Sequence, residues 1–246
     1  MASANPLSWW RGFLALPNDN LAKTLGVAFL VALICSLLVS ITAVALKPLR
    51  DANRLADSAA HITGMLEILG AGLPDTHFVD LATGAYVDHD PGTRTDLPEE
   101  RDLAGLGSRE DVATVFELRD GGKLKLVILP VRGTGYQSTL KGYLALEADL
   151  NTVAALSFYA QEETPGLGAR IAESAWQALW PGKRLADAED VIRIEVVKGA
   201  GAGVHQVDGI SGATRTGTGI TNLMRFWLGP DGYGPYLQRL RKEAGR

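Results

Sequence analysis

Cysteine is nearly absent from this sequence of 246 residues, which contains only Cys35. A single thiol cannot form an intrachain disulfide, and it cannot build a cysteine-ligated metal or iron–sulfur site. Histidine is scarce too, and its four occurrences, at positions 61, 77, 89 and 205, show no metal-ligand spacing. The sequence has no long basic cluster, and its 24 basic residues are outnumbered by 28 acidic ones. We therefore expect neither a metal site nor a nucleic-acid partner.

Charge is missing from one long stretch, residues 25–46, where 22 consecutive positions carry none. At about 1.5 Å per residue, a helix of this length crosses a hydrocarbon core of about 30 Å. The sequence thus predicts a lead over residues 1–23 and a transmembrane helix over 24–46. A cleaved signal peptide is the alternative, because Ala43-Val44-Ala45 is an A-x-A string, but signal h-regions run only about 7–15 residues. Basic residues on both sides leave the orientation undecided.

The rest of the pattern predicts an α+β protein, in which the transmembrane helix is followed by a mixed, largely antiparallel sheet domain with flanking helices. Apolar residues at helical spacing predict a stalk helix over 47–72, ended by Gly70 and Gly72. A membrane-proximal α/β part over 73–135 follows, with a polar insertion at 88–111 from which we expect no chemistry, and then a part over 136–246. Strands are predicted at two places within 78–87, at 112–118 and 124–131 as a hairpin, and at 142–147 and 152–159.

Thr214 is the residue that most needs an explanation, because it ends the segment Asp208-Gly209-Ile210-Ser211-Gly212-Ala213-Thr214. The small residues before it leave the backbone open, so a modifying enzyme could reach its hydroxyl, or a phosphate could lie close to it. Apolar spacing predicts a helix downstream, with Thr216 or Thr218 as its N-cap and Gly229-Pro230 as its stop. A phosphate near Thr214 would then lie close to a helix N-terminus, where an anion is stabilised.

Two other interpretations of this segment stay open. A Ser-Gly-Ala-Thr string also suits a tight turn that leads into a helix. Ser211 could instead be a hydrolase nucleophile, although the segment lacks the final glycine of G-x-S-x-G and none of the four histidines is an evident partner base.

A second loop, Glu163-Thr164-Pro165-Gly166-Leu167-Gly168, is rigid at its proline and open at its glycines, which suits the close approach of a flat ring system or an ordinary turn. A short helix is predicted around 173–180, and a strand at 191–197. The glycines at 199, 201 and 203 do not open a helix, so we interpret them as a loop and not as a dinucleotide site. Residues 233–246 are predicted to form a short helix with a basic, solvated end.

Taken in order, these segments resemble the C subunit of the Na⁺-translocating NADH:quinone oxidoreductase, a membrane-anchored flavoprotein of bacterial respiratory chains. The resemblance covers most of the chain from about residue 22. The segments that carry it are the 25–46 anchor with its stalk helix, Val127-Ile128-Leu129-Pro130-Val131-Arg132-Gly133-Thr134-Gly135, the 163–168 loop, Trp176 with Trp180-Pro181-Gly182-Lys183, the segment Val207 to Thr214, and Phe226-Trp227-Leu228-Gly229.

The resemblance implies that Thr214 carries FMN through a phosphoester bond, made from FAD by a separate flavin transferase. It also implies a flavin-binding cleft, for which Thr164, Pro165, Gly166 and Leu167 are candidate contacts. Ser211, Gly212, Ala213 and Trp176 complete the candidate cofactor-binding residues, and we expect no catalytic side chain.

The same resemblance implies a single-pass protein of the bacterial inner membrane with a periplasmic soluble domain. Other subunits of a multi-subunit complex would be its partners, and within that complex it would relay electrons toward quinone, coupled to Na⁺ export. Residues 1–20 and the 88–111 insertion depart from the family pattern. The equivalent flavin subunit of an Rnf-type ferredoxin:NAD oxidoreductase, and a non-redox anchored structural subunit, are the alternatives.

Overall fold

A computed structural model describes residues 15, 17, 20–68, 70 and 72–244 of the chain. These residues fall into two compact units, Met1–Ala56 and Asp57–Arg246. Most of the predicted 1–23 lead, including the Trp9-Trp10 pair, lies outside the described residues.

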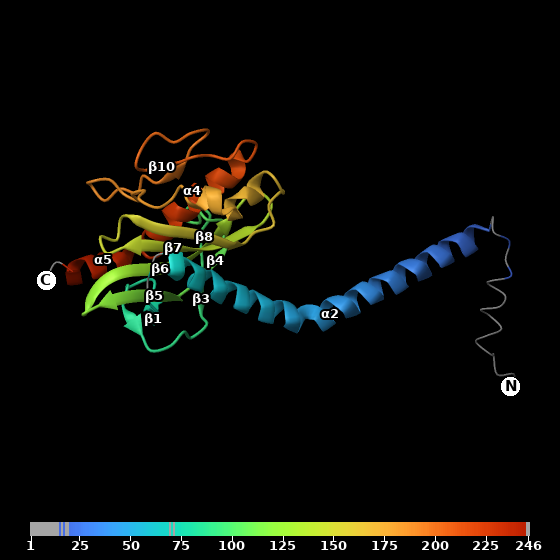
Figure 1. The fold of residues 1–246 in the computed structure, drawn as a ribbon. Coiled ribbons are helices and arrows are strands. Elements are labelled where there is room, and N and C mark those ends of the chain that lie inside the picture. Colours follow the sequence, from blue (N-terminus) through green and yellow to red (C-terminus); the bar gives the residue numbers. More distant parts are fainter. Residues whose placement is uncertain (1–14, 16, 18–19, 69, 71, 245–246) are drawn as a thin grey trace. The chain divides into compact units, whose positions relative to one another are not determined.

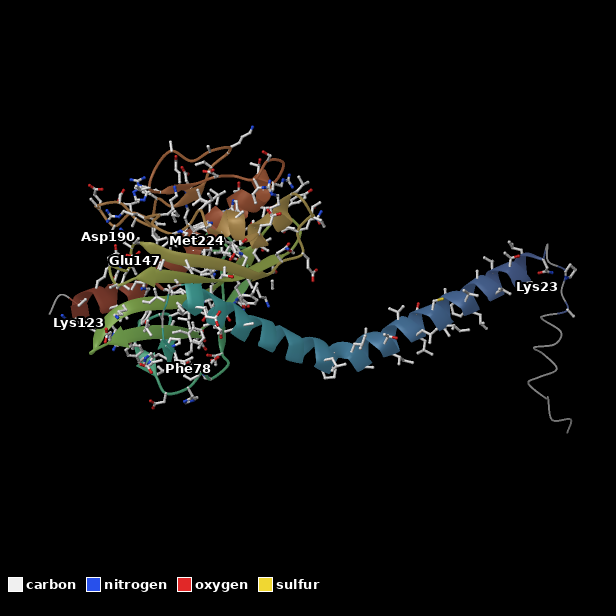
Figure 2. The ribbon with its side chains drawn as sticks, in the orientation of Figure 1. Lys23, Phe78, Lys123, Glu147, Asp190 and Met224 are labelled. Atoms are coloured by element: carbon white, nitrogen blue, oxygen red, sulfur yellow. The ribbon has the colours of Figure 1, made fainter. Side chains whose placement is uncertain are left out.

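The main element of the first unit is helix α2 (Leu21–Ile68), whose last residues belong to the second unit. Its stretch Lys23–Leu49 is long and apolar enough to cross a membrane, and its side chains project without being buried (Figure 2). One continuous helix, with Pro48 inside it, therefore covers the predicted anchor and most of the predicted stalk. Past its end, the φ angle of Gly70 is +59°, as expected for a glycine that terminates a helix.

The second unit is built on a six-stranded sheet in the order β2-β1-β5-β6-β7-β8 (Figure 1), in which all neighbours are antiparallel. This confirms the predicted antiparallel α+β fold, and the predicted boundary at residues 135/136 lies just after β6. The strands are β1 (Asp75–Asp80), β2 (Tyr86–Val87), β5 (Val112–Asp120), β6 (Lys123–Thr134), β7 (Thr139–Glu147) and β8 (Val153–Ala160).

Alternation along β6 divides the core between the two faces of the sheet. Val127, Leu129 and Val131 belong to the larger cluster, which includes the buried side of α4 (Thr214–Leu228). Leu126 and Ile128 belong to a smaller cluster on the opposite face, closed by the C-terminal end of α2 through its buried Leu66. In Figure 1 the orange to red segment that carries β10 (Gln206–Val207) and α4 covers the first of these faces.

Several elements differ from the predicted pattern. The polar insertion contains the pair β3 (Arg94–Asp96) and β4 (Ser108–Glu110), and the strand expected at 191–197 is reduced to β9 (Glu195–Val196), which pairs in parallel with β10 (Gln206–Val207). The helix expected at 173–180 is the single turn α3 (Ser174–Gln177), preceded by the 3₁₀ helix η1 (Gly168–Ala172).

The predicted N-cap of the helix after Thr214 is wrong. Helix α4 begins at Thr214 itself, and the preceding Ala213 provides no side-chain cap. The two expected caps have other partners, since the Thr216 hydroxyl donates to Glu163 and that of Thr218 donates to the carbonyl of Thr214. The predicted stop at Gly229 is confirmed.

Helix α5 (Gly234–Ala244) confirms the short helix predicted for this tail but corrects the expectation that the tail is solvated, because it buries Tyr236, Leu237 and Leu240 against the larger core. Its basic residues Arg241 and Lys242 still lie in the last turn.

Candidate functional site

Three segments that are distant in the sequence enclose a cavity of about 450 Å³. They are the turn after β6, the loop between β8 and η1, and the N-terminal end of α4. The residues that line the cavity are Tyr136, Glu163, Thr164, Leu167, Gly168, Gly212, Ala213, Thr214, Arg215 and Thr216. The structure thus brings together the two loops that the sequence singles out.

Thr214 is exposed and is the first residue of α4, so its side chain stands at the helix N-terminus beside the cavity. The first amides of a helix have no intrahelical acceptor, and the earliest such bond here runs from the Gly217 N–H to the Ala213 carbonyl, at 3.1 Å. The first turn carries no acidic side chain. This helix end therefore offers free donors and positive potential to an anion.

Two side-chain hydrogen bonds hold the backbone of the segment before Thr214. The Trp176 indole Nε1 donates to the carbonyl of Asp208 at 2.9 Å, and the Asp208 carboxylate accepts the N–H of Gly201 at 2.8 Å. Trp176 is only 6% exposed and is packed near Phe158 and Trp180, outside the lining of the cavity. Its connection to the site therefore passes through the Asp208 carbonyl.

The 163–168 loop contributes Thr164, Leu167 and the buried Gly168 to the cavity wall. The N–H of Leu167 donates to the Thr164 carbonyl at 3.1 Å, and the intervening Gly166 has a φ of +73°, which a residue with a side chain rarely adopts. Gly166 and Pro165 are exposed and lie outside the lining of the cavity. Leu167 remains 40% exposed, an apolar surface that faces the cavity.

Glu163 is the buried charge of the site, only 4% exposed. Its carboxylate accepts the N–H groups of Tyr136, Gln137 and Ser138 and the hydroxyl of Thr216. Burial alone would raise the pKa of Glu163, but these hydrogen bonds outweigh it and hold the pKa below its ordinary range. The carboxylate is therefore ionised at neutral pH.

Tyr136 and Arg215 form a rim on the cavity, with the guanidinium carbon of Arg215 5.3 Å from the centre of the Tyr136 ring. The sequence-based site contains neither of these two residues, nor Glu163, Gly168 or Thr216. Glu163 and Gly168 could have been included from the sequence, since they are the first and last residues of the 163–168 loop. Tyr136 and Arg215 belong to no periodic or turn pattern that marks a site.

The hydrolase interpretation of Ser211 finds no support in this arrangement. Ser211 itself is exposed and lies outside the lining of the cavity, and the lining residues, all within the described part of the chain, include no histidine or cysteine. The ring Nδ1 of His205 lies 2.7 Å from the carbonyl of Arg184, so that nitrogen already has a backbone partner.

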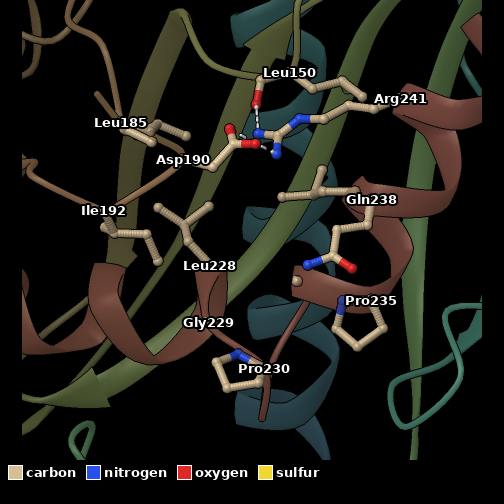
Figure 3. Close-up of a pocket in the computed structure, with 13 residues that line it drawn as sticks. Leu150, Leu185, Asp190, Ile192, Leu228, Gly229, Pro230, Pro235, Gln238 and Arg241 are labelled. Carbon is tan, nitrogen blue, oxygen red and sulfur yellow. Dashed lines mark hydrogen bonds and ion pairs between the residues drawn. The ribbon is translucent and has the colours of Figure 1, made fainter. Parts of the chain in front are cut away.

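A second cavity, of about 310 Å³, lies between α5 and the segment around Leu185 (Figure 3). Apolar side chains dominate its wall, and the guanidinium of Arg241 contacts Asp190 at 3.3 Å and the Leu150 carbonyl at 3.2 Å. None of the candidate residues predicted from the sequence lines it.

Comparison with known proteins places the first cavity inside a matched family domain. Residues 135–229 match the family described as FMN-binding domain, and this span contains every residue that lines that cavity. The chain is 40% identical to the C subunit of the Na(+)-translocating NADH-quinone reductase of Pseudomonas aeruginosa, covering 92% of this chain and 98% of that protein. It is 37% identical to the protein of the same name from Vibrio parahaemolyticus, covering 93% and 98%.

Solved structures agree with this similarity. The crystal structure of Shewanella oneidensis NqrC superposes with a TM-score of 0.65 at 32% identity, covering 69% of this chain and 85% of that chain. The crystal structure of the corresponding reductase subunit from Parabacteroides distasonis gives a TM-score of 0.53 at 29% identity, covering 67% and 78%.

Proposed function

Because this chain belongs to the NqrC family, the C subunit of the Na⁺-translocating NADH-quinone reductase, an oxidoreductase complex, we propose that it carries FMN covalently through a phosphoester bond to Thr214. The observation that carries the proposal is the position of this hydroxyl. Thr214 is exposed, begins a 15-residue helix and lines a cavity within the span that matches the FMN-binding family.

The residues present suit a phosphate at this position. An esterified phosphate keeps about one negative charge, which the free amides at the start of α4 stabilise. The exposed Arg215 adds a cation beside the same helix end. Ser211, Gly212 and Ala213 leave the approach open, because their side chains are small or absent.

The remaining cavity residues orient the cofactor and limit its contact with water. We assign the contact surface for the flavin to the loop that carries Thr164, Pro165, Gly166 and Leu167, with the exposed Leu167 as its apolar part. Trp176 supports the attachment segment through the Asp208 carbonyl. When bound, FMN supplies the redox chemistry, and the protein supplies attachment, orientation and electrostatics.

Within the complex, we propose that this subunit relays electrons toward quinone during turnover that is coupled to Na⁺ export. The Lys23–Leu49 stretch serves as a single anchor in the lipid bilayer of the inner membrane, with the sheet domain in the periplasm. Attachment requires a flavin transferase: the Thr214 oxygen bonds to the phosphorus of the FMN moiety of FAD, the pyrophosphate bond breaks with AMP as the leaving group, and the hydroxyl proton is released.

Substitution of Thr214 tests the proposal directly. The full-length chain is co-expressed with a flavin transferase, and covalent flavin is measured by peptide mass spectrometry and by in-gel fluorescence after denaturation. We expect an FMN-phosphate adduct on the Thr214 peptide of the wild type, no adduct in Thr214→Ala, and some adduct in Thr214→Ser.

Thr218→Ala is the matched control, because Thr218 is also exposed and lies one turn further along α4. We expect it to load flavin as the wild type does. A Thr214→Ala protein that keeps fluorescence through denaturation would refute the attachment site. A wild type that stays colourless beside an active transferase would favour a non-redox anchored subunit.

A further inference from the structure

We propose that Glu163 is a positioning residue for flavin attachment: its buried carboxylate fixes, through Thr216, the helix end that presents Thr214, and fixes the Tyr136 wall through backbone amides. This inference rests on the proposed function of Thr214 and assigns a role to a residue that does not itself contact the attachment point.

The contacts of the carboxylate join all three segments of the cavity. One oxygen, Oε1, accepts the N–H groups of Gln137 at 3.0 Å and Ser138 at 3.1 Å, both in the turn after β6. The other, Oε2, accepts the Thr216 hydroxyl at 2.7 Å, in the first turn of α4. Glu163 itself lies in the loop after β8, so a single side chain connects this loop to segments that are 25 and 53 residues away from it in the sequence.

Two glycines show how closely the surrounding backbone fits this carboxylate. A Cβ atom added at Gly135 would lie 2.6 Å from Glu163 Oε1, and one added at Gly168 would lie 2.8 Å from Oε2 and 2.6 Å from the hydroxyl of Thr216. Neither position tolerates a side chain without displacing the carboxylate or its partners. The charge is thus enclosed by the cavity wall and has little freedom to move.

The hydrogen bond to Thr216 transmits this order to the attachment point. Thr216 is only 1% exposed and lies two residues after Thr214 in the same helical turn. Ala213 provides no side-chain cap for α4. The hydrogen bond from Thr216 to Glu163 instead joins the start of α4 to the 163–168 loop. Bonds to ionised acceptors are shorter and stronger than bonds between neutral groups, so its loss should loosen the position of Thr214.

The experiment uses the full-length chain with a flavin transferase and FAD, and measures the initial rate of covalent flavin incorporation. Thr216→Val removes the hydroxyl and keeps the shape of the side chain, whereas Thr216→Ser keeps the hydroxyl. We expect kcat/KM for incorporation to fall at least tenfold in Thr216→Val and to stay within threefold of wild type in Thr216→Ser. In the flavin-loaded protein, the visible circular dichroism should change in Thr216→Val and be restored in Thr216→Ser.

Thr221→Val is the matched control for a general loss of stability. Thr221 is buried on the same helix and its hydroxyl is also hydrogen-bonded, to the Val196 N–H at 2.9 Å and to the Gly217 carbonyl at 3.1 Å, but it lies outside the lining of the cavity. We expect near wild-type incorporation from this variant. Equal slowing in Thr221→Val and Thr216→Val would reduce the effect to stability and overturn the inference.

If Thr216→Val does not fold, Glu163→Gln decides the same question, because it removes the charge and keeps the size of the side chain. We expect at least threefold slower incorporation and an altered flavin dichroism in this variant. Wild-type values in both respects would overturn the inference while leaving Thr214 as the attachment site. A wild type that takes no flavin would overturn the proposed function, and the inference with it.

Discussion

Removing the hydroxyl of Tyr236 should cost more stability than removing the equally buried hydroxyl of Tyr233. The Tyr236 hydroxyl donates at 2.6 Å to the carboxylate of Glu117, whereas that of Tyr233 donates at 2.8 Å to the neutral carbonyl of Pro130. Glu117 is fully buried and also accepts bonds from Tyr86 and from Arg119. The Tyr236 bond joins α5 to the charge on β5.

The magnitude follows from the acceptor. A hydrogen bond to a charged group contributes about 1.5–3 kcal/mol, against about 0.5–1.5 kcal/mol for a neutral pair. We therefore expect Tyr236→Phe to lower the free energy of unfolding by about 1.5–3 kcal/mol, and Tyr233→Phe by about half as much. For a domain of this size the corresponding fall in Tm is about 3–12 °C and about 1–6 °C.

Urea unfolding of the full-length chain in detergent, followed by tryptophan fluorescence, measures both variants against the wild type. The slope of the free energy with urea should be unchanged, so that the shift in midpoint reports stability alone. Equal losses from the two substitutions would refute the reasoning, since the charge on Glu117 would then contribute nothing to the bond.

The remaining predictions concern pH and close packing. Burial raises the pKa of Glu117, but its bonds from Tyr236, Tyr86 and Arg119 outweigh burial and hold it below the ordinary value of 4.5. The ionised Glu117 therefore stabilises the fold fully above that pH, and this stabilisation is lost as the pH falls through the folded-state pKa. We expect the free energy of unfolding of Glu117→Gln to fall less steeply than that of the wild type between about pH 5 and 3. Parallel curves for the variant and the wild type would contradict this. Gly168→Ala should lower the free energy of unfolding by about 1–3 kcal/mol through overpacking, and it should slow flavin loading. Gly182 has a φ of +81° and open space around it, so Gly182→Ala should lower the free energy of unfolding by about 1–2 kcal/mol through backbone strain and leave flavin loading unchanged. Equal flavin loading in the Gly168→Ala and Gly182→Ala variants would contradict the role of the 163–168 loop.

The elements that local pattern predicted well are those whose signals lie within a few residues. The β5–β6 hairpin follows from two apolar runs around a turn in which Gly121 and Gly122 both have positive φ angles. The helix that starts beside Thr214 follows from apolar spacing and a glycine stop, and the antiparallel sheet follows from the succession of short strands.

The sequence predicts the ends of helices and the burial of the tail less well, because contacts with residues distant in the sequence decide them. Thr216 is an expected N-cap because a threonine near a helix start usually is one, but its hydroxyl donates a hydrogen bond to a carboxylate 53 residues earlier. A basic end favours a solvated tail, yet the hydroxyl of Tyr236 donates a hydrogen bond to a carboxylate 119 residues away. Such contacts leave no periodic trace in the sequence.

Segment order and residue chemistry were therefore enough to indicate the anchor, the sheet and the threonine at a helix start, because each rests on local spacing and conformational preference. The cavity required the folded chain. Tyr136, Glu163 and Thr216 become neighbours only when the turn after β6, the loop after β8 and the first turn of α4 pack together around one buried carboxylate, and that packing depends on the whole of the sheet and its core.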